Sequence, residues 1–263
     1  MRRSKMTAAL ATVLAACAVI LAEQPVADAA DDSELYLVAT AYTYDEAVSG
    51  DAATGSTTKA TADTSCTDGT YALKTWKVNS LNWLYNGAGV PAKIASTALG
   101  TITAATDTVA KATNRCGQPT IAGSTFKYAG TTAVKPQIAT NGTCTGNDGK
   151  SVTGWGALPA KMLAYTCTYY NARGAVVASD TLIDNVAYTW FTTKPANCTG
   201  QQYDLQTTLT HERLHTAGLG HVDQAKNAAQ VMTPASSPCD TSRRLLGAGD
   251  YAGLKALAAR ATR

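Results

Sequence analysis

The sequence predicts an α+β fold, because segments with strand-like patterns are interrupted by three segments with helical patterns. The first helical pattern runs from Pro91 to Asn114, and the second begins after Asp204 and ends at Gly218. The third occupies residues 250–259, near the C-terminus. We therefore expect a β-sheet, two long helices and a shorter helix at the end of the chain.

The N-terminal half contains two extended segments and a long helix. Residues 35–42 alternate apolar and small polar side chains, which predicts a strand, whereas residues 49–69 are small and polar and predict a loop. A second extended stretch covers residues 76–85 and ends at an Asn-Gly pair. Pro91 suits the first turn of the helix, which then presents apolar residues at helical spacing: Ile94, Ala98, Ile102, Ala105, Val109 and Ala112.

The middle of the chain predicts further strands and a glycine-rich loop. The extended segments are residues 125–129, 133–139 and 162–170, and the last of these returns over residues 175–178 as a hairpin. Residues 141–156 carry five glycines and predict a loop, which either shapes a substrate cleft or is an ordinary surface connection. Residues 180–191 form one more apolar segment.

All three histidines of the chain fall within residues 211–221, on and just after the second helix. His211 and His215 are four residues apart, so a helix presents both imidazoles on one face. Gly218 can adopt the left-handed conformation that ends a helix, and the turn brings His221 back to the same point. Three neutral imidazoles leave one tetrahedral position open for water, as in catalytic zinc sites. The pattern predicts a zinc centre.

Glu212 follows the first of these histidines directly. It is rotated by about 100° around the helix axis from that ligand, which removes it from the coordinating face. Its carboxylate can instead reach a water on the metal and act as a general base. The alternative is a structural zinc site that only holds the fold together, or a site that has lost activity.

The N-terminus has the pattern of a secretion signal. Charged residues are followed by an apolar run over residues 7–22, and residues 27–29 fit a cleavage site. The run is too short and wrongly flanked to be a stable membrane span. Residues 14–17 also resemble the lipobox of bacterial lipoproteins, so a lipid anchor at Cys17 is the alternative to cleavage after Ala29. Either way, we expect an exported, extracellular protein.

Six cysteines remain once Cys17 is set apart, and an even number in an exported chain predicts three disulfides. They have no close-pair spacing that would favour zinc binding. Of the fifteen possible connectivities, we favour the one that links Cys198 to Cys239, because this bond brackets the second helix. Closing such a loop stabilises a fold by about 3–4 kcal/mol. The other bonds would then pair Cys144 with Cys167 and Cys66 with Cys116.

The net charge and the length of the chain narrow the kinds of binding partner that we expect. The net charge of +3 is small, and no run of Lys or Arg interleaves with aromatic residues, so nucleic acid is not an expected partner. The charged fraction of 16% suits an extracellular, disulfide-linked protein. The chain after residue 29 is long enough for one domain with a sizeable core, and we expect a monomer.

The zinc motif, together with a methionine eleven residues after its last histidine, resembles the metzincin clan of zinc endopeptidases. In that clan, a tight turn at the position of Met232 lies beneath the histidines as an apolar floor. Pro234 and residues 249–254 are most similar to the matrixins, of a secreted bacterial type, and the resemblance spans residues 74–260. It implies a twisted mixed β-sheet with two long helices, an active-site zinc helix, and a small C-terminal subdomain after Gly218 that ends in a helix.

The resemblance also implies an activity, which is the hydrolysis of peptide bonds at zinc. Residues 74–263 would form the catalytic domain, and residues 30–73 would be either a short pro-segment or the start of that domain. A protein or peptide substrate would lie in extended form along an exposed sheet edge. The segment 223–244 would shape the specificity pocket.

Two departures from the clan limit what can be carried over. Pro234 stands where astacin-like and serralysin-like members have a tyrosine, so no tyrosine ligand is expected. The even number of cysteines argues against Cys66 as the free thiol of a cysteine switch. Two other functions stay open: a secreted zinc-binding module that recognises a peptide or surface without cutting it, and a zinc hydrolase acting on a non-peptide amide.

Overall fold

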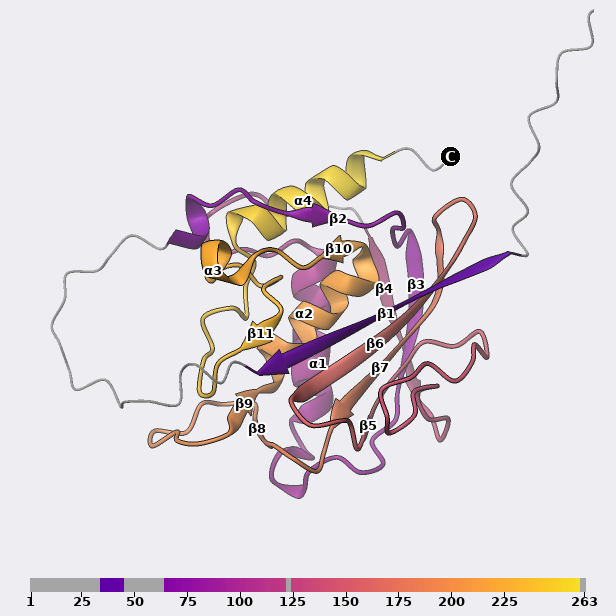
Figure 1. The fold of residues 1–263 in the computed structure, drawn as a ribbon, viewed down its shortest axis with the longest axis vertical. Helices are drawn as coiled ribbons and strands as arrows, with labels where there is room; N and C mark the ends of the chain where they lie inside the picture. Colours follow the sequence, from indigo (N-terminus) through magenta and orange to yellow (C-terminus); the bar gives the residue numbers. More distant parts are fainter. Residues whose placement is uncertain (1–33, 45–63, 122–123, 261–263) are drawn as a thin grey trace, which may run out of the picture. The chain divides into compact units, whose positions relative to one another are not determined.

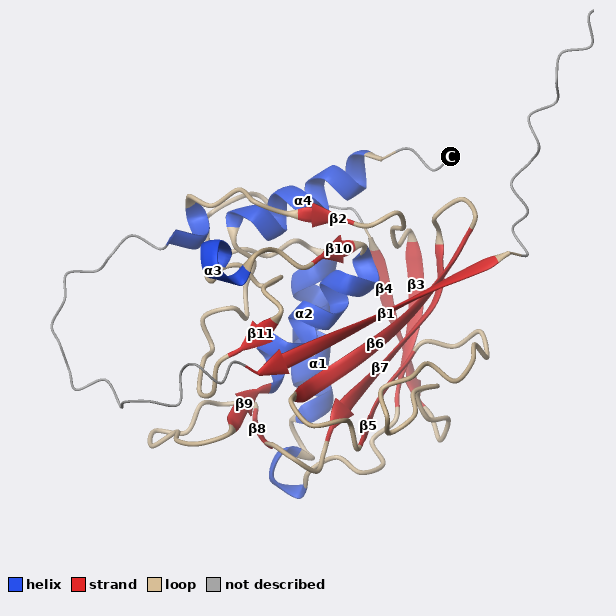
Figure 2. Cartoon of the chain, in the orientation of Figure 1, coloured by secondary structure: helices blue, strands red, loops and turns tan. Residues whose placement is uncertain are grey.

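The computed structural model describes residues 34–44, 64–121 and 124–260 and shows an α+β fold (Figure 1). Strands of a mixed sheet and the helices beside them are distinguished in Figure 2. The predicted secretion signal, the alternative lipid anchor at Cys17 and most of the predicted loop at residues 49–69 lie outside the described residues. Within the part of the chain that is described, no helix is long and apolar enough to cross a membrane.

A seven-stranded mixed sheet forms the centre of the fold, in the strand order β11-β1-β6-β7-β5-β3-β4. Strands β4, β3, β5 and β7 run parallel to one another, β6 is antiparallel to β7, and β1 is antiparallel to β6. The short strand β11 runs parallel to β1 at the far edge. The strands are β1 (Leu35–Tyr44), β3 (Ser80–Tyr85), β4 (Thr125–Thr131), β5 (Val152–Gly156), β6 (Met162–Asn171), β7 (Val176–Asp184) and β11 (Ala235–Ser236).

Two helices, α1 (Ala98–Ala110) and α2 (Leu205–Ala217), pack against each other and against the sheet. The largest core cluster lies at this junction and takes Ile102 from α1, Leu209 from α2 and Trp83 from β3, all essentially without solvent exposure. Burying such side chains is the main favourable term in folding, and here it fixes α2 against a rigid sheet.

Shorter elements lie at both ends of α2. Helix α4 (Ala248–Ala259) closes a second apolar cluster with Leu214 of α2 and with Met232 (Figure 1). Strand β2 pairs with β10, and β8 pairs with β9. These remaining elements are β2 (Ala72–Leu73), β8 (Thr189–Phe191), β9 (Gln202–Asp204), β10 (Leu219–Gly220), α3 (Gln224–Asn227) and the 3₁₀ turns Thr64–Cys66 and Ala92–Ile94.

The predicted N-terminal segment, residues 30–73, contributes two separate parts to the fold. Strand β1 joins the sheet between β6 and β11. Residues 64–73 belong to the other side of the molecule, where a disulfide joins Cys66 to Cys116 and β2 pairs with β10. The two parts are therefore held by different contacts.

Several predicted elements are confirmed and two are wrong. The strands predicted at residues 35–42, 125–129 and 162–170 are present as parts of β1, β4 and β6. The first long helix is shorter than its pattern, because a 3₁₀ turn at Ala92–Ile94 precedes the α-helix that begins at Ala98. The hairpin return extends further than predicted, because β7 runs on through residue 184.

The prediction of a loop over the whole of residues 141–156 is wrong, because Val152–Gly156 forms the strand β5 between β7 and β3. Its glycines serve close packing rather than a turn. A Cβ atom on Gly154 would lie 2.9 Å from Cδ of Pro136, and one on Gly156 would lie 3.1 Å from Leu182. A glycine inside a strand commonly marks such a close approach.

The prediction of a strand at residues 133–139 is also wrong. This segment makes only an isolated bridge between Ile138 and Cys144. Pro136 has no N–H group to give to a ladder, and the next N–H group, that of Gln137, donates to the carboxylate of Asp180 at 2.8 Å. The backbone here is satisfied partly by this side chain and partly by main-chain hydrogen bonds of Gln137 and Ala139 to Thr145 and Thr143.

Three disulfides form with the connectivity favoured from the sequence: Cys66 with Cys116, Cys144 with Cys167, and Cys198 with Cys239. Cys66 is therefore not a free thiol. Near the Cys198–Cys239 bond, the N–H group of Cys239 donates to the carbonyl of Gln202 in β9. This joins the segment before α2 to the segment that follows β11.

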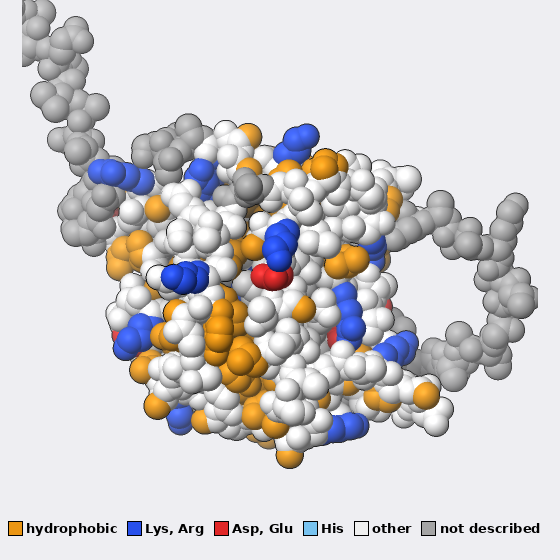
Figure 3. Space-filling model, turned by 180° about the vertical axis from the view of Figure 1, so that it is seen from behind, with side chains coloured by type: hydrophobic (Ala, Val, Ile, Leu, Met, Phe, Trp, Pro, Cys, Tyr) orange, Lys and Arg blue, Asp and Glu red, His pale blue; other side chains and the backbone are white. Residues whose placement is uncertain are grey.

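The surface carries few charges. On the face drawn in Figure 3, Lys and Arg side chains stand apart among uncharged ones rather than forming one block. This agrees with the low charged fraction of 16%.

Gly218 ends α2 in the predicted left-handed conformation, with φ of 119°. Its N–H group donates to the carbonyls of Leu214 and His215, which closes the last turn of the helix. A Cβ atom at this position would overlap the carbonyl oxygen of Trp76. Only glycine therefore allows the chain to turn here towards β10 and His221.

We expect Gly218→Ala to lower the free energy of unfolding by at least about 2 kcal/mol, because it adds backbone strain and a steric overlap. Urea denaturation measures this. Gly100→Ala in α1 is the matched control, because nothing lies within 4 Å of a Cβ there and alanine favours a helix by about 0.5–1 kcal/mol. Equal stability of the two variants would contradict the role given to Gly218.

Candidate metal centre

Helix α2 is positioned by an N-terminal cap and by almost complete burial. The carboxylate of Asp204 accepts hydrogen bonds from the N–H and hydroxyl groups of Thr207 at 3.0 and 2.7 Å. Arg244 binds both oxygens of the same carboxylate, at 2.8 and 2.6 Å. A capped and ion-paired first turn fixes where the helix begins, and hence where its later residues point.

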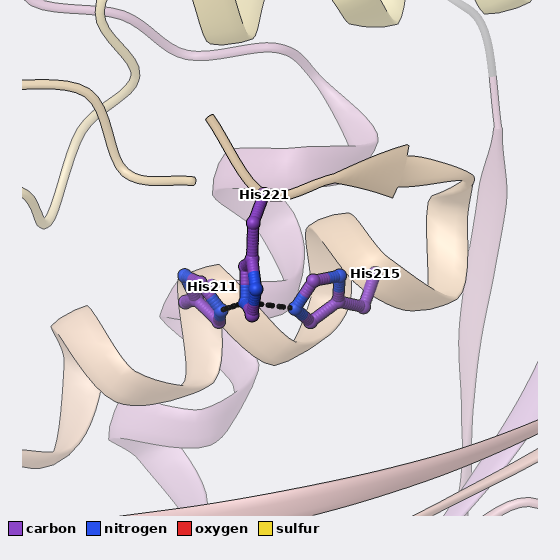
Figure 4. Close-up of side chains that lie close together, drawn as sticks. All are labelled: His211, His215 and His221. Carbon is purple, nitrogen blue, oxygen red and sulfur yellow. Dashed lines mark hydrogen bonds between the residues drawn. The ribbon is translucent and has the colours of Figure 1, made fainter. Parts of the chain in front are cut away.

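The three predicted ligands converge on one point (Figure 4). The Nε2 atom of His221 lies 3.1 Å from Nε2 of His211 and 2.9 Å from Nε2 of His215. His211 and His215 are buried, whereas His221 is the most exposed of the three. The spacing in the sequence therefore predicted a real cluster of three imidazoles.

The other ring nitrogens decide which tautomers are present. Nδ1 of His211 lies 2.7 Å from the carbonyl oxygen of Val231, and Nδ1 of His215 lies 3.0 Å from that of Leu219. A carbonyl only accepts, so each Nδ1 carries the proton and each Nε2 presents a lone pair. His221 can bring at most one proton to the point where the three Nε2 atoms meet.

Protonation of the rings does not relieve this arrangement. Burial lowers the pKa of His215 to about 3 and that of His221 to about 4, and it lowers the pKa of His211 as well. All three imidazoles are thus neutral at ordinary pH. Two Nε2 lone pairs therefore face the Nε2 atom of His221, and three neutral imidazoles are a donor set that could hold a metal ion. Tetrahedral coordination with metal–nitrogen bonds near 2.0 Å separates nitrogens by about 3.3 Å, close to the distances found.

The turn at residues 231–232 supports two of the three ligands. The carbonyl of Val231 accepts from His211, and the carbonyl of Met232 accepts from the N–H group of Val222, next to His221, at 3.0 Å. Met232 itself is buried among apolar side chains, so its side chain contributes packing. The floor expected beneath the histidines stays a prediction.

Asp250 holds that turn in place, a role that the sequence did not reveal. Its carboxylate accepts from the N–H groups of Val231, Met232 and Gly247 at 2.9, 3.2 and 3.0 Å. Burial raises the pKa of Asp250 to about 6, whereas the three backbone donors lower it. The only signal in the sequence was an acidic residue in the first turn of the last helix, which is also an ordinary feature of helices.

Glu212 lies on α2 beside His211 and has no exposed area. Neither carboxylate oxygen has a hydrogen-bond partner among the described residues. Burial raises the pKa of Glu212 to about 8. A buried carboxyl group without partners is costly to a fold, which favours a role in binding or chemistry over a role in stability.

Two further neighbours of the centre were not indicated by the sequence. Arg213 is fully buried, donates to the hydroxyls of Thr106 and Thr153, and lies 5.0 Å above the ring of Trp83. It links α2 to α1 and to β5. Tyr42 of β1 stacks on the ring of His211, with ring centroids 3.8 Å apart. Nothing local in the sequence connects residues so far apart.

No family model matches the chain, and no curated protein matches its sequence. Conclusions about function therefore depend on the chemistry of the centre.

We expect Asp250→Asn to destabilise the fold by about 1–3 kcal/mol, because an amide places N–H donors against backbone N–H groups. It should also weaken metal affinity by roughly 10–100-fold, because Val231 no longer orients His211 firmly. Urea denaturation and competition with a fluorescent zinc chelator measure the two effects. Asp107→Asn, at a half-exposed ion pair on α1, is the control and should change stability by less than about 0.5 kcal/mol. An unchanged metal affinity in Asp250→Asn would refute the positioning role.

Proposed function

We propose that the protein is an exported zinc-dependent endopeptidase of the metzincin type. The observation that carries this proposal is the combination of an open set of three neutral imidazoles with Glu212, whose buried carboxylate has no partner among the described residues. A closed structural zinc site needs a fourth protein ligand and no neighbouring base.

His211, His215 and His221 would hold the metal through their Nε2 atoms. Zinc suits three imidazole donors, and when bound it polarises a carbonyl group and lowers the pKa of a coordinated water. Val231 and Leu219 orient two of the rings through Nδ1, and this fixes the tautomers that present lone pairs.

Glu212 would carry the protons of the reaction. It accepts a proton from the attacking water and delivers it to the nitrogen of the leaving amine. No other histidine exists in the chain to share this task.

Export is supported by the cysteines. Three disulfides in one chain are typical of proteins that fold in an oxidising compartment. Together with the signal pattern of the N-terminus, they favour an extracellular protein. We propose that it acts on protein or peptide substrates as a monomer.

Glu212→Gln tests the role of the base. We expect the variant to bind zinc as the unmodified protein does, and to lose about 10²–10⁴-fold in hydrolysis of a quenched fluorescent peptide. Atomic absorption measures the zinc, and initial rates measure the activity. Glu34→Gln, an exposed carboxyl group outside the centre, is the matched control. Unchanged hydrolysis by Glu212→Gln would exclude the mechanism, and peptide binding without hydrolysis by the unmodified protein would favour a recognition module.

Removal of the metal tests the role of the histidines. A chelator should abolish hydrolysis, and added zinc should restore it. Zinc at about 1,000 times its dissociation constant should raise the free energy of unfolding by roughly 4 kcal/mol, because it binds the folded state. His221→Ala should show neither the recovery of activity nor the stabilisation. A chelator-resistant activity would contradict the proposal.

A further inference from the structure

Strand β1 lies across the metal centre, held on both sides by main-chain contacts. It is antiparallel to β6 along its length and parallel to β11 at its end, and it contacts α2 (Figure 1). The N–H group of Thr43 donates to the carbonyl of Pro234 at 3.1 Å, and that of Tyr44 donates to the carbonyl of Lys161 at 3.2 Å. A short extended segment held in this way resembles a peptide bound by strand addition.

One side chain of β1 enters the centre. Tyr42 has no exposed area, and its ring stacks on His211 with an angle of 17° between the ring planes. Beside it, Tyr44 pairs with Ser236 of β11, and Thr43 pairs with Ala235, whose carbonyl accepts a hydrogen bond from Arg243. Arg243 and Ser236 are themselves buried and belong to the segment expected to shape a specificity pocket. Tyr42 therefore fills a pocket formed by a metal ligand and by that segment.

The two ends of β1 differ in burial. Leu35, Tyr36 and Leu37 are 45%, 39% and 47% exposed, whereas Tyr42 is completely buried. A strand that belonged to the core would be expected to bury its large side chains along its length. Here the burial is concentrated at the metal centre, as for a peptide held by its backbone and one anchoring side chain.

The described segment that follows β1 in the chain is held to the body of the fold by contacts of its own. The next described segment begins at residue 64 and is tied to the body by the Cys66–Cys116 bond. Without β1, the order of the sheet leaves β6 as its edge, next to α2. With β1 in place, His211 and Glu212 have no exposed area.

We propose that β1 is an internal substrate mimic. It occupies the groove between β6 and β11 in which an extended peptide binds, and Tyr42 occupies the pocket that selects the substrate's side chain. This inference rests on the proposed function. It assigns the site to extended peptides that carry an aromatic residue, tyrosine above all, at the position of Tyr42. It also makes the full chain less active than a chain in which β1 is displaced.

Peptide binding tests the proposal without requiring catalysis. The full chain, zinc-loaded and carrying Glu212→Gln, is titrated with a labelled peptide of the sequence of residues 35–44, and fluorescence anisotropy is read. Adding Tyr42→Ala empties the pocket and should tighten peptide binding at least tenfold. Adding Tyr36→Ala, the same change at an exposed position of the same strand, should alter it less than twofold. A peptide in which alanine replaces the tyrosine that corresponds to Tyr42 should bind at least tenfold more weakly. Equal affinities for the two protein variants would overturn the proposal.

Two further measurements cover a failure of Tyr42→Ala to fold and separate this inference from the proposed function. Thr43→Pro removes the main-chain donor to Pro234 while leaving the pocket side chain unchanged, and should also tighten peptide binding. In both loosened variants, backbone amides of β6 should exchange with deuterium at least tenfold faster than in Tyr36→Ala. Unchanged exchange would overturn the proposal.

With Glu212 present, Tyr42→Ala should hydrolyse a quenched peptide at least tenfold faster than the unmodified chain. Altered peptide binding and amide exchange without any hydrolysis would contradict the proposed function. The inference that β1 occupies the peptide-binding groove would still be supported. Hydrolysis that is equal in all variants, with unaltered binding, would keep the peptidase and reject the substrate mimic.

Discussion

Three nitrogen lone pairs meet at one buried point, and much of the structure is arranged to hold them there. The carbonyls of Val231 and Leu219 fix the protons of two rings on the outer nitrogens. These carbonyls come from different parts of the chain, one before α4 and one directly after α2. The turn at Gly218, the turn at residues 231–232 and the carboxylate of Asp250 are all needed to keep this geometry against electrostatic repulsion. A bound cation converts the repulsion into an attraction.

The interior around α2, like the chain as a whole, relies on uncharged polar groups more than on charged ones. Around α2, buried hydroxyl groups take the place of ion pairs: Thr166 bonds to Thr181, and Ser179 bonds both to Thr168 and to Thr216 on α2. These contacts couple the helix to β6 and β7 without the desolvation cost of charges. Charged groups are buried beside the helix at few places, and two of them, Glu212 and Arg213, are neighbours at the metal centre.

Features that depend on a few neighbouring residues could be predicted from the sequence, whereas features that depend on residues far apart in the chain could not. The spacing of His211, His215 and His221 concerns only one helix and one turn, and the structure brings the three imidazoles together as predicted. The caps of α2 are equally local. The disulfide between Cys198 and Cys239 was inferred from the loop that it closes. Strand β5 was missed because Gly154 and Gly156 indicate a turn unless the close approach of Pro136 and Leu182 is known. The stacking of Tyr42 on His211 depends on strand pairing across the whole chain, for which a single sequence has no local signal.

The short strand β11 gives the groove an adjustable wall. In the described part of the chain it pairs with no strand other than β1, so its strand pairing there is supplied by the segment that lies beside it. Its remaining support comes from Arg243, which donates to the carbonyl of Ala235, and from the nearby bond between Cys198 and Cys239. Under the proposed function, part of the energy of binding a ligand would be spent on ordering this wall. Selectivity for a side chain and the rate of product release would then both depend on the same two residues of backbone.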